Sequence, residues 1–344
     1  MSARMIAAVA IIASMGAIAA FAPAQALRPR QTSGPAMTSR PPSQPNTPAG
    51  VKAFRDVQYA TVGNIKLRMD VLVPTAQSAA SAGSPAGPLP LVVFIHGGGW
   101  RMGSKEANRA RFLVPRGYVV ASINYRLTPQ ASWPAQIEDC KAAIRYLRAH
   151  ASDYSIDPER VGVFGTSAGG HLAALLGTSG EIKGLEGGVG ECTDQSSRVQ
   201  AVVDFFGPAD FPNFQATPQV EAIITSPKDG LFRGTADEIH KMAVEASPVT
   251  HATKDDPPFL ICHGDKDTTV PIRQSELLET ALKKAGVDVT FHVVKGAGHG
   301  FNDPKIDLLV AGFFDKHLKK AATQPATAPA TATAPAIPPS DVRR

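Results

Sequence analysis

The amino-acid sequence predicts an α/β protein with a mostly parallel, doubly wound sheet and helices on both faces. Between residues 52 and 320, short apolar segments alternate with amphipathic ones, which is the pattern of strands connected by helices. Leu89–Ile95 is an apolar run, as expected of a strand buried on both faces. A Gly-x-Ser-x-Gly motif separates another apolar run, Val161–Phe164, from an Ala/Leu-rich segment, which indicates a sharp turn from strand into helix.

The other elements follow from the same alternation. A hairpin is predicted over Phe54–Val62 and Ile65–Val73, followed by a polar loop over Pro74–Pro88. Further strands are predicted at Tyr118–Ile123, Val199–Phe206, Phe259–His263 and Val287–Val294. Helices are predicted at Lys105–Pro115, Ala135–Ala149, Ser167–Leu176, Pro271–Ala285 and Ile306–Leu318. The alternation lapses over residues 211–257, and this insertion is expected to form a small lid above the carboxyl ends of the strands.

The two ends of the chain differ in composition from this region. Residues 1–26 combine Arg4, an apolar run over Met5–Phe21 and an A-x-A cleavage pattern, as secretory signal peptides do. An uncleaved membrane anchor is the alternative, because the run approaches the length of a membrane span. Residues 27–51 and 321–344 are rich in proline and small residues and are expected to be disordered. We therefore expect a secreted or periplasmic protein, without stable membrane insertion after signal cleavage.

Charge and cysteine content argue against some classes of function. The net charge is +5, to which residues 1–51 contribute four charges and residues 321–344 one, so the region between them is neutral. Because it has no basic stripe, nucleic-acid binding is not expected. The three cysteines show no metal-ligand spacing, and we expect neither a metal nor another cofactor. Cys140 and Cys262 are expected to be buried thiols, and whether Cys192 pairs with Cys140 stays open.

Ser167, in Gly165-Thr166-Ser167-Ala168-Gly169, has the setting of a catalytic nucleophile. Such a serine projects from a strained turn, where side chains two residues to either side would collide with neighbouring backbone. The free N–H groups of the helix that begins here favour developing negative charge. Gly/Ser turns without a catalytic role can carry the same motif, so the assignment depends on partners elsewhere in the chain.

A glycine run supplies the first of these partners. The strand Leu89–Ile95 leads into His96-Gly97-Gly98-Gly99-Trp100, where backbone N–H groups can point into a site without side chains in the way. Together with the N–H of Ala168, this loop is suited to stabilise an oxyanion. His96 is expected to fix the loop rather than to act as a base.

An acid and a histidine follow the nucleophile in the chain. Asp265 and Asp267 come directly after the strand Phe259–His263, and either could orient a histidine. His299 lies in a loop of small residues after the last strand, with the room that a catalytic imidazole needs. The order Ser167, Asp267, His299 is that of α/β-hydrolase triads.

These motifs together resemble α/β-hydrolase esterases of the acetyl-xylan/feruloyl esterase group called BD-FAE, and more distantly the hormone-sensitive-lipase-like carboxylesterases. The resemblance rests on HGGGW (96–100), INYRL (123–127), PAQIEDCKAAIRYL (134–147), GTSAGGHLAALLG (165–177), AVVDFFGPADF (201–211), HGDKDTTVP (263–271) and KGAGHGF (295–301). It covers nearly all of residues 52–320 and implies an α/β-hydrolase fold. The insertion after Asp210 is the least family-like region.

The resemblance also implies roles for particular residues. It identifies Asp267 as the catalytic acid and leaves Asp265 a structural role. It identifies the backbone N–H groups of Gly98 and Gly99, with that of Ala168, as the oxyanion donors, and Gly97 is a further candidate.

The sequence therefore predicts an exported serine esterase that hydrolyses small acyl esters, of acetyl or feruloyl type, carried by carbohydrate. The expected partner is a small acyl ester or an acylated polysaccharide. Trp100 and Phe211 are candidates for lining the substrate pocket. His171 and His263 are expected to be packed in the core, and the paired acids of the helix at 135–149, Glu138 and Asp139, to cap or solvate it.

Two alternatives remain open. Prolyl-oligopeptidase-like peptidases share the triad order, but they usually carry a large additional domain, whereas about 25 linker residues precede the catalytic region here. A catalytically silent hydrolase fold used as a binding module usually lacks a triad member, whereas this sequence retains all three.

Overall fold

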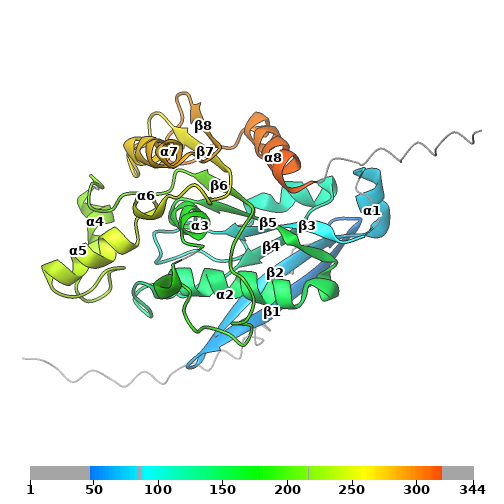
Figure 1. Cartoon of the computed structure of the whole chain (residues 1–344), viewed down its shortest axis with the longest axis horizontal. Helices are drawn as coiled ribbons and strands as arrows, with labels where there is room; N and C mark the ends of the chain where they lie inside the picture. The colour runs from blue at the N-terminus through cyan, green and yellow to red at the C-terminus, as the bar shows by residue number, and fades with distance from the viewer. Residues whose placement is uncertain (1–46, 84–86, 181, 216, 320–344) are drawn as a thin grey trace, which may run out of the picture. The chain divides into compact units, whose positions relative to one another are not determined.

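The computed structural model describes residues 47–319 except 84–86, 181 and 216. The signal peptide, most of the linker and the C-terminal tail predicted from the sequence lie outside the described residues. In the described part, eight strands form one sheet in the order β1-β2-β4-β3-β5-β6-β7-β8 (Figure 1). The pairs β1–β2 and β2–β4 are antiparallel and the other five are parallel. The predicted α/β fold with a mostly parallel sheet is confirmed.

The strands are β1 (Val51–Val62), β2 (Ile65–Pro74), β3 (Leu89–Ile95), β4 (Val119–Ile123), β5 (Ile156–Thr166), β6 (Ala201–Phe205), β7 (Phe259–Gly264) and β8 (Val289–Val294). The α-helices are α1 (Ala76–Ser81), α2 (Ala135–Ala149), α3 (Ala168–Thr178), α4 (Pro218–Thr225), α5 (Ala236–Glu245), α6 (Pro248–His251), α7 (Arg273–Ala285) and α8 (Pro304–Leu318). The 3₁₀ segments of the described residues are η1 (Arg109–Arg116), η2 (Ala151–Tyr154) and η3 (Lys183–Leu185).

The sheet separates two hydrophobic cores, because successive side chains of a strand point to opposite faces. In β3, Leu91, Val93 and Ile95 belong to one core, and Val92 and Phe94 belong to the other. The first core also receives the apolar sides of α2, α3 and α7, and the second those of η1 and α8. All seven residues of β3 are buried, as its apolar sequence predicts.

Several predicted boundaries differ from the structure. The first strand begins at Val51, within the predicted linker, and Val51 pairs with Pro74 of β2. The predicted loop 74–88 contains α1, which Thr75 caps by accepting a hydrogen bond from the N–H of Ser78. The predicted helix 105–115 is only the 3₁₀ segment η1, which contains Pro115. A proline disfavours a regular α-helix there, because it lacks an N–H donor and clashes with the preceding turn.

The insertion between β6 and β7 forms a lid that contains α4, α5 and α6. Figure 1 shows α4 and α5 together on one side of the molecule. An ion pair fastens the lid to the loop after β3: Arg101 Nη2 donates to Asp229 Oδ2 at 2.6 Å. A backbone bond fastens it to the segment before α2, where the N–H of Trp133 donates to the carbonyl of Leu231 at 2.9 Å.

Asp139 of α2 has a different role from the one predicted for it. It is fully buried, and its carboxylate accepts hydrogen bonds from both the Nε and the Nη2 of Arg126, at 2.7–2.9 Å. The backbone N–H of Arg126 donates to the same carboxylate at 2.8 Å. This bidentate pair fixes the segment after β4 against α2, so the acid does not solvate the helix.

We expect Asp139→Asn to lower the free energy of unfolding by about 3 kcal/mol, because Arg126 loses its fully buried counter-charge and keeps only the longer ion pair with Glu138 at 3.4 Å. Urea unfolding followed by circular dichroism measures this change. Asp288→Asn is the control, because the ion pair of Asp288 with Lys316 is more than half exposed and its loss should cost less than about 1 kcal/mol. Equal losses in the two variants would contradict a structural role for the buried pair.

Candidate active site

Ser167 occupies the sharp turn between β5 and α3. Its backbone has φ 55° and ψ −120°, a conformation that non-glycine residues rarely adopt. Two flanking glycines make the turn possible. A Cβ on Gly165 would lie 1.9 Å from the carbonyl oxygen of Gly169, and one on Gly169 would lie 2.1 Å from that of Ile95. Gly165 and Gly169 are therefore required, because a side chain at either position would collide with neighbouring backbone.

Three side chains from three loops form a hydrogen-bonded chain. His299 Nε2 lies 2.9 Å from Ser167 Oγ, and His299 Nδ1 lies 2.7 Å from Asp267 Oδ2. An imidazole that donates from Nδ1 to the carboxylate has an unprotonated Nε2, which can accept the proton of the serine. The structure thus brings together the three residues that the sequence assigns to the triad.

The loop after β7 holds Asp267 as an anion. Its Oδ1 accepts from the N–H groups of Thr269 and Val270, at 2.8 and 2.9 Å. Its Oδ2 also lies 3.2 Å from Nε2 of the buried His263. Burial raises the pKa of Asp267, but the hydrogen bonds with His263, His299 and Val270 outweigh it and hold the pKa well below 3.8. The Asp267 carboxylate therefore remains charged throughout the pH range in which an imidazole titrates.

The glycine loop after β3 presents backbone donors beside the nucleophile. Gly98 and Gly99 have φ of 120° and 60°, and a Cβ on Gly98 would lie 2.1 Å from the carbonyl oxygen of Met102. In the described part of the chain, the N–H groups of Gly98, Gly99 and Ala168 have no hydrogen-bond acceptor. They are free to bind an oxyanion.

His96 fixes this loop, as its position in the motif suggests. Its Nδ1 donates to the carbonyl of Gly97 at 2.8 Å, and its ring stacks on Tyr125 with centroids 4.4 Å apart. The hydroxyl of Tyr125 in turn donates to the carbonyl of His96 at 3.0 Å. With 1% of its surface exposed, His96 is not placed to act on a substrate.

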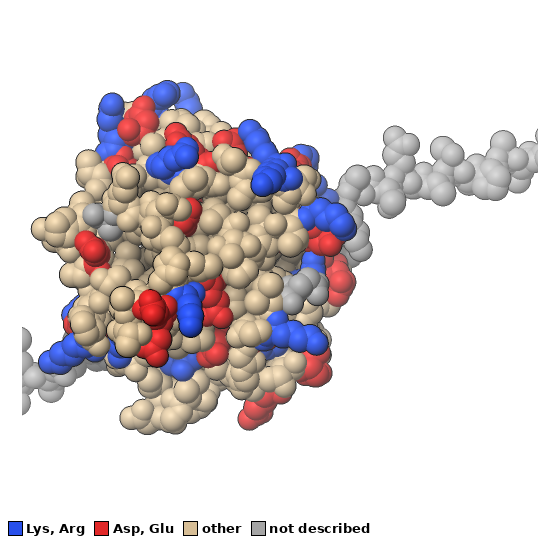
Figure 2. All heavy atoms as spheres, turned by 60° about the vertical axis from the view of Figure 1, so that its left-hand side comes forward, with Lys and Arg blue, Asp and Glu red and all other residues tan. Residues whose placement is uncertain are grey.

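A cavity of about 360 Å³ opens beside Ser167 and His299. Most of its wall is apolar. The lining residues are Gly98, Gly99, Trp100, Met102, Ser167, Phe206, Pro208, Phe214, Val220, Ile223, Thr269, Val270 and His299. On the face shown in Figure 2, lysines and arginines alternate with acids around broad uncharged areas.

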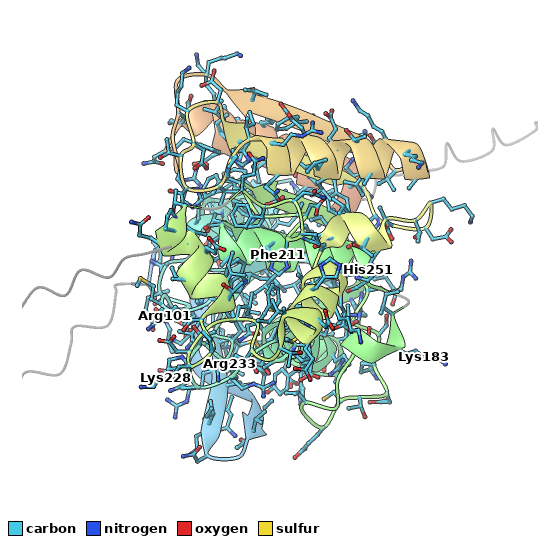
Figure 3. All side chains as sticks on the ribbon, turned by 90° about the vertical axis from the view of Figure 1, so that its left-hand side faces the viewer. Arg101, Lys183, Phe211, Lys228, Arg233 and His251 are labelled. Atoms are coloured by element: carbon cyan, nitrogen blue, oxygen red, sulfur yellow. The ribbon has the colours of Figure 1, made fainter. Side chains whose placement is uncertain are left out.

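Of the two aromatic residues predicted to line the pocket, only Trp100 does so. Phe211 is buried behind it, with ring centroids 5.7 Å from Trp100 and 4.9 Å from His171. Figure 3 shows Phe211 in the middle of this side of the molecule, surrounded by other side chains. The N–H of Phe211 donates to Ser247 Oγ at 2.9 Å, which directs this part of the lid inward.

Other lining residues were not identified from the sequence. Val220 and Ile223 lie on α4, inside the lid, where the sequence shows no periodicity that would orient them. Phe206 directly follows β6 and has φ 45°. Thr269 could have been found, because it follows Asp267 within the same motif.

No three His, Cys, Asp or Glu side chains among the described residues are grouped so that they could hold a metal ion. In the same part of the chain, no helix has the length and apolar character needed to cross a bilayer.

A family model, BD-FAE, matches residues 69–282 and thus more than half of the chain. The chain belongs to the BD-FAE family. The mycobacterial esterase LipC of Mycobacterium tuberculosis is 32% identical over 222 residues, which are 63% of this chain and 54% of LipC. LipQ of the same organism is also 32% identical, over 64% of this chain and 52% of LipQ. This BD-FAE chain thus spans about half the length of the curated relatives that it matches.

Solved structures agree with this membership. A truncated carbohydrate esterase from gut microbiota has a TM-score of 0.67 and 32% identity, over 78% of this chain and 97% of that one. A bifunctional GH43-CE protein of Bacteroides eggerthii has a TM-score of 0.66 and 33% identity, over 77% of this chain and 38% of that one. A butyrate-bound Thermogutta terrifontis esterase has a TM-score of 0.63 and 25% identity, over 80% of this chain and 97% of that one. The BD-FAE chain therefore has the α/β-hydrolase fold.

In this BD-FAE chain, Asp267→Asn should lower kcat for ester hydrolysis by about 10⁴-fold while the fold is retained, because an amide cannot hold the catalytic tautomer or stabilise the imidazolium. Steady-state kinetics measure the loss. The control is Asp265→Asn, since Asp265 accepts from the N–H of Gly296 at 2.6 Å and pairs with Lys295 at 3.6 Å, and its loss should affect kcat less than tenfold. A larger loss from Asp265→Asn than from Asp267→Asn would reassign the acid.

Proposed function

We propose that the protein is an exported serine esterase that hydrolyses small acyl esters through an acyl-enzyme. The observation that carries the proposal is the hydrogen-bonded chain from Ser167 through His299 to Asp267, beside free N–H groups at Gly98, Gly99 and Ala168. Membership in the BD-FAE family and similarity to named esterases support it. Export rests on the sequence of residues 1–26 alone.

In the first half of the reaction, Ser167 Oγ attacks the ester carbonyl carbon while His299 Nε2 takes its proton. Asp267 stabilises the resulting imidazolium, and the backbone donors bind the oxyanion. When the tetrahedral intermediate collapses, its C–O bond to the alcohol breaks and His299 returns the proton to the leaving alcohol.

In the second half, the same groups hydrolyse the acyl-enzyme. Water attacks the acyl carbonyl carbon as His299 takes one of its protons, and the new tetrahedral intermediate breaks its bond to Ser167. His299 then gives the proton back to Ser167 Oγ, and a carboxylic acid leaves. Protons and electron pairs balance over the two halves, and the reaction needs no further reagent besides water.

The substrates that we propose are acetyl- or feruloyl-type esters carried by carbohydrate. The apolar wall of the cavity suits the acyl group, because Val220, Ile223 and Phe214 offer no hydrogen bonds to a sugar. The similarity of the chain to the carbohydrate esterase from gut microbiota supports the carbohydrate portion.

The function is tested by hydrolysis of 4-nitrophenyl esters of increasing acyl length, with acetylated xylan and methyl ferulate in parallel, by wild type and Ser167→Ala. We expect hydrolysis by the wild type and a loss of at least about 10³-fold in the variant, since the nucleophile is absent. Circular dichroism verifies that Ser167→Ala is folded. An active, folded Ser167→Ala, or a wild type that cleaves dipeptidyl amides faster than esters, would contradict the proposal.

The lid should determine which acyl groups fit. Ile223→Trp on α4 fills part of the cavity, and we expect kcat/KM for a hexanoyl ester to fall at least about tenfold relative to an acetyl ester. Ala222→Trp is the matched control, because Ala222 is exposed on the same helix outside the cavity and should leave the ratio unchanged. An unchanged ratio in Ile223→Trp would place the acyl group elsewhere.

A further inference from the structure

His171 lies one helical turn after Ser167 on α3 and is fully buried, but it has no place in the proposed reaction. Its Nδ1 accepts a hydrogen bond from Trp100 Nε1 at 3.2 Å. Its Nε2 lies 2.8 Å from the carbonyl oxygen of Ala246, which can only accept. The second bond places the ring proton on Nε2 and leaves Nδ1 as the acceptor that Trp100 needs. The imidazole therefore links three separate segments in one defined tautomer.

Each of the three segments belongs to the catalytic centre or borders it. Trp100 ends the glycine loop, has φ 56° and lines the cavity, so its position limits where Gly98 and Gly99 can place their N–H groups. Ala246 follows α5 of the lid. His171 itself is carried by the helix of the nucleophile, and its N–H donates to the carbonyl of Ser167 at 3.0 Å.

We propose that His171 is a positioning residue, which holds Trp100 and with it the glycine loop in register with Ser167 by bridging the indole N–H to the carbonyl of Ala246. This inference rests on the proposed esterase reaction. A loop displaced by about 1 Å can cost on the order of 10²-fold in rate, because the donors then miss the oxyanion. His171 touches no substrate and acts through Trp100 alone.

The surroundings of the ring keep it neutral. Trp100, Phe211 and Trp133 enclose it, with ring centroids at 5.4, 4.9 and 6.3 Å. Burial lowers the pKa of His171 to about 4, although the bond to Ala246 opposes this. Protonation would turn Nδ1 into a donor and break the bond with Trp100.

The charged groups on the neighbouring segments bond elsewhere. Glu245 accepts from Trp133 Nε1 at 2.8 Å. Asp204 accepts from the N–H of Gly207 at 2.9 Å, and Asp210 accepts from the side-chain amide of Asn213. Among the described residues, none of these carboxylates forms a hydrogen bond with the imidazole. The link between Trp100 and Ala246 through His171 therefore depends on its two hydrogen bonds with neutral groups.

The first experiment measures kcat and KM for 4-nitrophenyl butyrate in His171→Phe, which keeps a ring but removes both hydrogen bonds. We expect kcat to fall about 10- to 100-fold with KM changed less than threefold. His171→Asn places an acceptor near the original Nδ1 and should recover most of the lost kcat. In a Trp100→Phe background, which lacks the donor, His171→Phe should have little further effect on kcat.

Leu175→Ala is the control for lost stability, because Leu175 is fully buried on the same helix and does not line the cavity. It should lower the melting temperature while kcat of the folded protein stays within twofold of wild type. If His171→Phe behaves like Leu175→Ala, the residue is merely structural and the inference is wrong. A wild type that hydrolyses no ester would contradict the proposed function itself. An active wild type whose His171→Phe variant behaves like Leu175→Ala would contradict only the positioning role, so the two failures are distinguishable.

A second experiment needs no substrate. The chain has two tryptophans, so Trp133→Phe leaves Trp100 as the single indole. Its emission should change with a midpoint near pH 4, at constant far-UV circular dichroism, and His171→Phe should abolish this step. If the change in emission near pH 4 persists in His171→Phe, the emission of Trp100 does not report on His171, which would contradict the proposed link between the two residues.

Discussion

The left-handed backbone at Ser167 is the constraint on which the catalytic centre depends. It is held by contacts on several sides: the N–H of Ser167 donates to the carbonyl of Phe205 at the end of β6, and Gly169 packs against the end of β3 at Ile95. The turn can therefore form only where β3, β5 and β6 lie in their parallel register. The sheet contributes to catalysis by forcing one residue into a conformation that the isolated chain would avoid.

The triad and the glycine loop could be predicted from sequence because each is local and follows a recognisable strand. In a parallel sheet the carboxyl ends of strands share one edge, so Ser167, Asp267 and His299 converge although 132 residues separate the first from the last. The predicted strands and longer helices were confirmed for the same reason: buried strands and amphipathic helices leave different apolar periodicities. At these positions the local sequence pattern and the topology of the sheet predict the same structure.

The remaining features depend on contacts between distant segments. Phe211 and Trp100 both appear as aromatics near the site, but only the fold decides that one faces the cavity and the other supports it from behind. The apolar residues of α4 that line the cavity belong to a lid held by the ion pair of Arg101 with Asp229, and no sequence motif indicates that pair. Asp139 looked like a surface acid because its partner, Arg126, lies in a loop that precedes the helix.

The cysteines have a consequence for the conditions under which the chain can fold. All three are free: Cys140 is buried in one core, Cys262 in the other across the sheet, and Cys192 is partly exposed. Thiols on opposite faces of a sheet cannot approach to bonding distance without rearranging the backbone. The described part of the chain is thus built without disulfide bonds, so a reducing environment removes no covalent cross-link from its fold, and the partly exposed Cys192 is the thiol open to oxidation.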